Sequence, residues 1–385
     1  MALKSTLSKL QLAGLYRENP VYEPIDGAYV LADGRRCLQL ASNNYLGMTH
    51  ELLVQQAAKA AIDKYGTGSG GARLTTGSHP LYAELENKLA KFKETEAALV
   101  FNTGYMANIG AISALMGKND VIFSDELNHA SIIDGCRLSG AKRVIFPHSD
   151  MSALARLLAG TACSGNRLIA VDGVFSMDGD IAPLPELVQI AKQYQALLMV
   201  DDAHATGVIG NGHGTAAYFG LQQAVPIQIG TLSKALGGEG GYVAGKRELI
   251  DFLINKARSY IFSTALAPAT IAVANAALDC LIKSDILVKQ LLNNAMFMRE
   301  QLAKNSVDVI GTITPILPIV VGEADTTLAI AKKLAEQGII VSAIRPPTVP
   351  QGQSRLRITV TAKHNKAELQ QAAKIIGQIY HEIKG

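Results

Sequence analysis

The chain has 385 residues, of which 48% are hydrophobic and 18% are charged, and its formal net charge is +3. A charged fraction below the usual ~25% indicates a large core and a buried subunit interface, and it excludes an intrinsically disordered chain. The nearly neutral charge, without any run of lysines and arginines, excludes a dedicated nucleic-acid-binding protein. The length predicts two domains, or one large α/β domain with an appendage.

The cysteines and the apolar segments predict a cytoplasmic protein that makes no contact with a membrane. Cys37, Cys136, Cys163 and Cys280 lie far apart and form no CxxC pair, as expected of reduced thiols rather than of disulfides or a zinc site. Residues 1–20 resemble an amphipathic helix and lack the apolar core of a signal peptide. No apolar run reaches the ~18 residues that a membrane-spanning helix needs.

Short apolar runs alternate with helical stretches in the first two thirds of the chain. The runs are 97–101, 121–124, 143–146, 168–171, 196–200, 227–230 and 241–244. The helical stretches between them include 105–116, 151–158 and 185–193. Because the runs are apolar at successive positions, both faces of their sheet are expected to be buried. This alternation predicts an α/β fold with a mainly parallel sheet covered by helices.

After residue 246 the pattern changes and predicts a smaller α+β C-terminal domain. Helices are expected at 268–282, 286–304, 326–337 and 366–383, and strands at 316–321, 339–342 and 355–360. We therefore expect three parts in the chain. They are an N-terminal segment (1–45) that packs with the small domain, a large domain (46–265) and the small domain itself (266–385).

Gly66–Gly71 matches the G-x-G-x-x-G pattern of dinucleotide-binding loops. That fingerprint requires a strand before it and a helix after it. Here an amphipathic helical stretch, residues 51–65, precedes it, so a flexible glycine-rich segment near a site is favoured. A nucleotide-binding regulatory module stays as an alternative.

Polar residues that follow the apolar runs form a candidate site. Asp201 and His204 follow the run 196–200, and Lys234 follows 227–230 within a segment of small and apolar residues. Ligand sites of open α/β sheets lie at the carboxyl ends of strands. A lysine in apolar surroundings is poised as a neutral amine for a Schiff base, the alternative being an ordinary surface lysine.

Two more strand ends contribute chemistry. His129 comes shortly after the run 121–124, and Gly104 opens a helix directly after 97–101, where backbone N–H groups would bind a phosphate. An acid, two histidines, a lysine and a phosphate-binding helix start are the set that pyridoxal 5'-phosphate (PLP) needs. A metal-dependent hydrolase built on Asp201, His204 and His129 is the alternative, but further ligands are not spaced nearby.

From Ser42–Gly47 to Arg355–Arg357 the sequence resembles the α-oxoamine synthases. These are fold-type I PLP-dependent transferases that condense an amino acid with an acyl-CoA, and they act as homodimers with shared active sites. The segment Ile344–Pro350 is most similar to the branch that joins L-alanine to a pimeloyl thioester in biotin biosynthesis. Condensation of glycine with acetyl-CoA is the nearest alternative. The resemblance leaves open whether the acyl carrier is coenzyme A or a carrier protein.

The resemblance implies a role for each matching residue, and no metal. The catalytic set would be Lys234, which holds the cofactor, Asp201 on the pyridine nitrogen, His129 stacked on the ring and His204. Ser176 and His204 would bind the phenolic oxygen of the ring. The phosphate would be bound by Gly104, Tyr105 and Thr231, together with Ser263 and Thr264 of the second subunit. The substrates would be bound by Asn43, His129, Arg345, Thr348 and Arg17, with Tyr16 as an alternative to Arg17.

Overall fold

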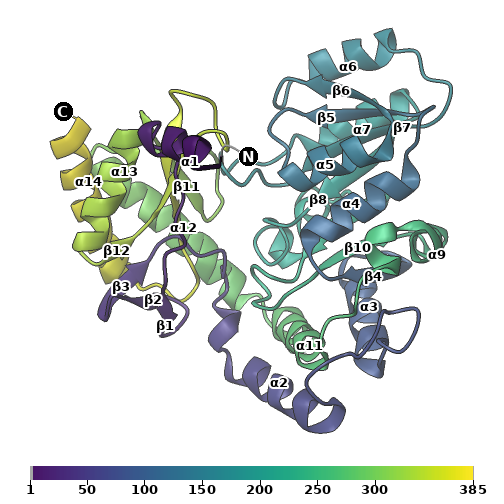
Figure 1. Cartoon of the computed structure of the whole chain (residues 1–385), viewed down its shortest axis with the longest axis horizontal. Coiled ribbons are helices and arrows are strands. Elements are labelled where there is room, and N and C mark those ends of the chain that lie inside the picture. The colour runs from purple at the N-terminus through teal and green to yellow at the C-terminus, as the bar shows by residue number, and fades with distance from the viewer. Residues whose placement is uncertain (1–2, 385) are drawn as a thin grey trace. The chain divides into compact units, whose positions relative to one another are not determined.

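The computed structural model describes residues 3–384, which form two compact units (Figure 1). The larger unit contains Met48–Ser176 and Ile181–Lys289. The smaller unit contains the chain up to Gly47, the short segment Met177–Asp180 and the chain from Gln290 onward. No helix of residues 3–384 is long and apolar enough to cross a membrane.

A seven-stranded sheet forms the centre of the larger unit (Figure 1). Its order across the sheet is β4 (Ala97–Phe101), β10 (Gly241–Gly245), β9 (Ile227–Thr231), β8 (Leu197–Asp201), β7 (Arg167–Asp172), β5 (Val121–Asp125) and β6 (Lys142–Phe146). Within this sheet β10 is antiparallel to both neighbours, and the pairs from β9 to β6 are parallel. The predicted mainly parallel sheet is confirmed, and the carboxyl ends of its parallel strands share one edge.

Both faces of this sheet are covered, which explains the apolar runs. Phe123 and Val200 pack in a core with α6 (Met151–Gly160) and α7 (Leu184–Gln193). Ile122 and Met199, their neighbours in sequence, pack on the other face in a core with α4 (Gly104–Leu115), α5 (Ala130–Ser139) and α9 (Arg247–Lys256). Because successive strand residues point to opposite faces, most positions of the inner strands are apolar, and the buried polar exceptions Ser124 and Gln228 are hydrogen-bonded.

The boundary after the larger unit lies later in the chain than the sequence suggested. The expected boundary followed residue 265, but α11 (Pro268–Lys283) packs on α2 (Leu52–Tyr65) and α3 (Pro80–Phe92) within the larger unit. The helix α12 (Ile286–Lys304) then begins, and the smaller unit resumes at Gln290. Burial of the apolar face of α11 against two helices of the larger unit accounts for this difference.

The smaller unit is built on two small sheets. An antiparallel sheet contains β11 (Ile316–Gly322), β14 (Ser354–Thr359) and β13 (Ser342–Ile344). The second sheet contains β1 (Glu23–Pro24), β2 (Tyr29–Ala32), β3 (Arg35–Gln39) and β12 (Ile339–Ile340), and α1 (Leu3–Leu12), α13 (Ala324–Glu336) and α14 (Lys366–Lys384) are further helices of this unit. The single strand expected over 339–342 was wrong, because β12 pairs with β3 while β13 pairs with β14.

A buried ion pair anchors the loop that follows β8. Lys93 Nζ lies 2.7 Å from Asp202 Oδ2, and each side chain is 1% exposed. Lys93 Nζ also donates to the carbonyl oxygen of His213, and Asp202 Oδ1 accepts from the Thr215 amide at 3.1 Å. Burial disfavours the charged amine, but the Asp202 carboxylate outweighs this effect and raises the pKa of Lys93.

We expect the substitution Lys93→Met to lower the free energy of unfolding by about 3–5 kcal/mol, because it leaves the Asp202 carboxylate buried and uncompensated. Urea denaturation of the full-length protein measures this change. Lys91→Met, at an exposed position of α3 two residues before Lys93, is the matched control and should change stability by less than about 0.5 kcal/mol. Equal stability of the two variants would contradict a structural role for the pair.

Candidate active site

A cavity of about 210 Å³ opens at the carboxyl ends of the parallel strands in the larger unit. It is lined by Thr103, Gly104, Tyr105, Asn108, His129, Ser131, Asp172, Ser176, Asp201, Ala203, His204, Thr231, Ser233 and Lys234. The structure therefore brings together eight residues that the sequence analysis singled out. These are Gly104, Tyr105, His129, Ser176, Asp201, His204, Thr231 and Lys234.

Asp201 ends β8 and is 4% exposed. Its Oδ1 accepts a hydrogen bond from the Ala203 amide at 2.9 Å, and its Oδ2 accepts one from Asn108 Nδ2 at 2.6 Å. A buried carboxylate keeps its charge only when such donors replace water. Asp201 is therefore held in one orientation on the wall of the cavity, with a lone pair of each oxygen still available to a ligand.

Asp172 is a second carboxyl group in the cavity wall. It ends β7 directly opposite Asp201 in the strand register, and its Oδ2 accepts a hydrogen bond from the His129 amide at 2.7 Å. Burial, followed by the nearby Asp201 carboxylate, raises the pKa of Asp172 well above its usual value. Asp172 follows the apolar run 168–171 but is not among the site residues predicted from the sequence, so the geometry adds it to the site.

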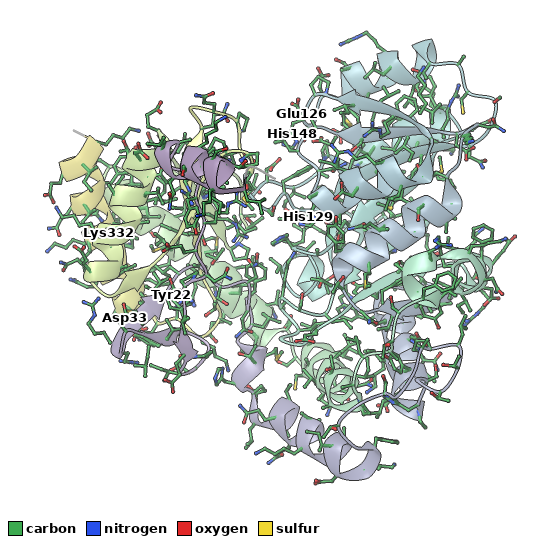
Figure 2. The ribbon with its side chains drawn as sticks, in the orientation of Figure 1. Tyr22, Asp33, Glu126, His129, His148 and Lys332 are labelled. Atoms are coloured by element: carbon green, nitrogen blue, oxygen red, sulfur yellow. The ribbon has the colours of Figure 1, made fainter. Side chains whose placement is uncertain are left out.

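His129, labelled in Figure 2, is the residue immediately before α5. Its Nδ1 accepts from the Ser131 amide at 3.2 Å and lies 2.7 Å from Ser131 Oγ, so the imidazole caps the helix. Part of the ring is open to the cavity, while protein atoms packed around the rest disfavour its charged form. This burial, more than the opposing effect of Asp201, lowers the pKa of His129, and Lys234 lowers it further.

The start of α4 has the geometry of an anion site. Thr103 is its N-cap and accepts from the Met106 amide at 3.0 Å, which leaves the amides of the first turn directed at the cavity edge. A Cβ at Gly104 would lie 3.4 Å from Thr231 Cβ, an ordinary contact distance, so the helix start lies directly beside the end of β9. Thr231 Oγ1 donates to the Gly240 carbonyl oxygen at 2.9 Å, and this bond fixes the hydroxyl at the same point.

Lys234, His204 and Ser176 complete the wall on the loops that follow β9, β8 and β7. Lys234 is half-buried, which agrees better with the predicted site lysine than with a surface lysine. His204 is 8% exposed. These three side chains supply an amine, an imidazole and a hydroxyl. The Asp201 carboxylate adds an acid, and the start of α4 adds a binding site for a phosphate. This set of groups fits PLP.

Ser263 and Thr264 are not among the described residues that line the cavity. Ser263 Oγ donates to the Ser259 carbonyl oxygen at 2.7 Å, and the Thr264 carbonyl oxygen accepts from Asn102 Nδ2 at 2.6 Å. Both therefore have partners within their own chain. Their predicted place at the site of a second subunit stays a prediction.

Apart from His129, which lies in the larger unit, the predicted substrate-binding residues belong to the smaller unit. Arg345 donates to the carbonyl oxygens of Gly14 and Tyr16, and Arg17 Nη2 lies 3.4 Å from Thr348 Oγ1. Asn43 Oδ1 accepts from Arg357 Nη2 at 3.1 Å. Tyr16 and Arg17, the two alternatives for the acyl-substrate residue, thus both contact the segment that follows β13.

Besides Asp172, four polar residues of the cavity wall were not predicted from the sequence: Thr103, Asn108, Ser131 and Ser233. Asn108 lies one turn after Gly104 in α4, a helix otherwise made of small, apolar and weakly polar residues, and that isolated amide was an available signal. Ser131 lies two residues after His129, and no local pattern distinguishes it from an ordinary helix-start serine.

The alternative sites suggested by the sequence receive no support. The segment Gly66–Gly71 begins at the C-cap of the helix α2, whereas a dinucleotide-binding loop follows a strand. Its last residue, Gly71, accepts a hydrogen bond from the Ala265 amide at 2.9 Å. Among residues 3–384 no group of His, Cys, Asp and Glu side chains is arranged to hold a metal ion.

Comparison with known proteins gives a consistent result. The family model "Aminotransferase class I and II" matches residues 35–376. The 8-amino-7-oxononanoate synthase of Geobacter sulfurreducens is 49% identical over 385 residues, which cover 99% of this chain and 98% of the relative. That of Citrifermentans bemidjiense is 50% identical over 376 residues, 97% of this chain and 96% of the relative.

Solved structures agree with this assignment. A serine palmitoyltransferase variant from S. paucimobilis with bound PLP–myriocin has a TM-score of 0.94 at 31% identity and covers 99% of this chain and 97% of its own. The 8-amino-7-oxononanoate synthase of Francisella tularensis has a TM-score of 0.77 at 31% identity, over 89% of this chain and 97% of its own. A chain with this fold, this cavity and these relatives belongs to the class I and II aminotransferase family and, within it, to the 8-amino-7-oxononanoate synthases.

Proposed function

We propose that this chain joins L-alanine to a pimeloyl thioester, with release of carbon dioxide and the free thiol, to give 8-amino-7-oxononanoate. The observation that carries the proposal is the cavity in which Lys234, Asp201, His129 and the start of α4 meet, in a chain 49% identical to a synthase of that name. PLP, when bound there, supplies the electron sink that stabilises negative charge on the α-carbon of the amino acid.

The residues of the larger unit position this cofactor and handle protons. The Lys234 amine holds the cofactor and, once released, accepts the α-proton of alanine. The Asp201 carboxylate holds a proton on the pyridine nitrogen, because an adjacent negative charge favours the protonated form. His129 would cover one face of the ring, His204 and Ser176 would donate to its phenolic oxygen, and the start of α4 with Thr231 would hold the phosphate.

The residues of the smaller unit are assigned to the substrates. The Arg345 guanidinium is a planar fork that suits bidentate binding of the alanine carboxylate. Its donors now contact the carbonyl oxygens of Gly14 and Tyr16, which are neutral acceptors that a carboxylate would displace with a gain in hydrogen-bond strength. Asn43 and Thr348 would line the amino-acid pocket, and Arg17 or Tyr16 the acyl pocket.

A substrate panel tests the reaction itself. Purified protein reconstituted with PLP is supplied with alanine, glycine or serine, each combined with pimeloyl-CoA, acetyl-CoA or palmitoyl-CoA, and thiol release is followed. We expect alanine with pimeloyl-CoA to give the highest kcat/KM of the nine pairs, and mass spectrometry to identify 8-amino-7-oxononanoate. A preference for glycine with acetyl-CoA would instead assign the nearest alternative, and thiol release without any amino acid would indicate a thioesterase.

We expect Lys234 to be the single residue that binds the cofactor covalently. Borohydride reduction of the reconstituted protein followed by peptide mapping should place the pyridoxyl label on Lys234 alone. Lys234→Ala should bind PLP through its phosphate without the visible absorption band of the native enzyme and should not turn over. Lys246→Ala, at an exposed position after β10, is the control that keeps both properties. A label on any other lysine would reject the assignment.

We also propose that two copies of this chain share their active sites in the cytoplasm. Phe262, which precedes Ser263 and Thr264, is 71% exposed, and Leu74 is 52% exposed. Exposed apolar side chains of this size are available for contact with a second copy of the chain. The four cysteines of the described chain are unpaired, as suits a reducing compartment. The hydroxyls of Ser263 and Thr264 would then reach the phosphate of the neighbouring copy.

Complementation tests the shared site. Lys234→Ala and the double variant Ser263→Ala/Thr264→Ala should each be nearly inactive alone. In a mixed dimer, one site carries both defects and the other carries neither, so refolding the two variants together should restore about one native site per heterodimer. Differential tags confirm the heterodimer content. Confirmed heterodimers without recovered activity, when the hydroxyl variant is itself inactive, would show that Ser263 and Thr264 serve their own chain.

A further inference from the structure

A continuous chain of hydrogen bonds runs behind the cavity from Asp201 to His129. Asn108 Nδ2 lies 2.6 Å from Asp201 Oδ2 and 2.9 Å from Ser131 Oγ, and Ser131 Oγ lies 2.7 Å from His129 Nδ1. Asn108 and Ser131 are each 1% exposed. The two residues project from α4 and α5, which pack against each other, so the chain joins two helices to the end of β8.

The donor and acceptor of each hydrogen bond follow from the groups involved. A charged carboxylate only accepts, so Asn108 must present its amide nitrogen to Asp201, and the second hydrogen of that nitrogen goes to Ser131 Oγ. The Ser131 hydroxyl hydrogen is then available for His129 Nδ1. The Ser131 backbone amide, which can only donate, points at the same Nδ1 from 3.2 Å. Both donors therefore require Nδ1 to be unprotonated.

We propose that Asn108 is a positioning residue that fixes the Asp201 carboxylate and, through Ser131, holds His129 as a neutral imidazole with its proton on Nε2. The catalytic consequence rests on the proposed function, whereas the hydrogen-bond chain is a property of the protein without its cofactor. A neutral ring stacks on a protonated pyridine without the repulsion that two cations would suffer.

The Asn108 side chain carries a cost that these two bonds explain. Its Oδ1 is buried without a hydrogen-bond partner among the described residues, and an unsatisfied buried carbonyl destabilises a fold. An apolar side chain at this position of α4 would avoid the cost of the unsatisfied carbonyl. A buried amide that satisfies only its donors is best explained by what those donors hold, namely Asp201 and Ser131.

The charged groups around His129 are consistent with a neutral ring. Lys234 disfavours the imidazolium and Asp201 favours it, while burial acts in the same direction as Lys234. Asp172 accepts from the His129 backbone amide and not from its ring. Within residues 3–384 the hydrogen-bond partners of Nδ1 are the hydroxyl and the backbone amide of Ser131, and these two donors decide the tautomer.

The tautomer can be observed directly by ¹⁵N NMR of the full-length protein labelled in its histidine rings, before and after addition of PLP. A His129→Asn variant identifies the signals of His129. We expect an unprotonated Nδ1 and a protonated Nε2 at pH 7 in both states. A protonated Nδ1, or a doubly protonated ring, would overturn the proposal. Because the cofactor-free protein gives the same readout, this result is independent of whether the protein makes 8-amino-7-oxononanoate.

Substitutions then test whether Asn108 sets this state. Asn108→Leu frees the Ser131 hydroxyl to accept from a protonated Nδ1, so the protonation midpoint of His129 should move to higher pH, and the Kd for PLP should rise about tenfold. Asn275→Leu is the matched control. Asn275 is also a buried helix amide that donates to a carbonyl oxygen, Leu81 O, and leaves its Oδ1 unpartnered, but it lies in α11 away from the cavity wall.

Asn275→Leu should leave both the His129 midpoint and the PLP affinity unchanged. Ser131→Ala removes the hydroxyl without touching Asp201, so it provides a second test if Asn108→Leu does not fold. We expect it to raise the His129 midpoint while changing PLP affinity less than Asn108→Leu does. An Asn108→Leu variant that titrates like Asn275→Leu, or a Ser131→Ala variant that titrates like the native protein, would reject the positioning role.

Discussion

A charged carboxylate inside a protein must find donors to replace water, and at the end of β8 this requirement applies twice in succession. Asp201 and Asp202 are 4% and 1% exposed. The first accepts from Asn108 and Ala203 and faces the cavity, and the second pairs with Lys93 and accepts from Thr215. The need to satisfy both groups fixes the helix α4 and the loop after β8 relative to the sheet.

The rest of the site follows from the parallel sheet. Strands that run in the same direction bring their carboxyl ends to one edge, and the helix that follows each strand starts there. Gly104, His129 and Lys234 are therefore near neighbours although they follow three different strands, β4, β5 and β9. The positive ends of α4 and α5 face the same edge, which favours an anionic ligand in the cavity.

The sequence was most informative where a local pattern repeats. The apolar runs predicted all seven strands of the large sheet to within one or two residues, because strands buried on both faces are mostly apolar. It was least informative about partners distant in the chain. The partition of α11 depends on packing against α2 and α3, and the split of 339–342 depends on two different partner strands. Neither the packing of α11 nor the two partner strands can be inferred from a short stretch of sequence.

In the site, too, residues marked by a local sequence pattern could be predicted, whereas residues defined by distant partners could not. The strand-end residues Asp201, His129 and Lys234 could be selected from the sequence, because their positions after apolar runs already imply one edge of a sheet. For Asn108 the isolated amide in an apolar helix was the one local signal, since it is 93 residues from Asp201 and 23 from Ser131, and its importance lies in touching both. The substrate roles of Arg345 and Asn43 came from family resemblance rather than from any physical pattern.

We expect the buried Asp201 carboxylate, held by Asn108, to keep the ring nitrogen of the cofactor protonated. NMR of protein reconstituted with PLP labelled with ¹⁵N at the pyridine ring measures this directly. The ring nitrogen should be protonated from pH 6 to pH 8 in the native protein and unprotonated in Asp201→Asn. An unprotonated nitrogen in the native protein at pH 7, or an unchanged signal in Asp201→Asn, would contradict it.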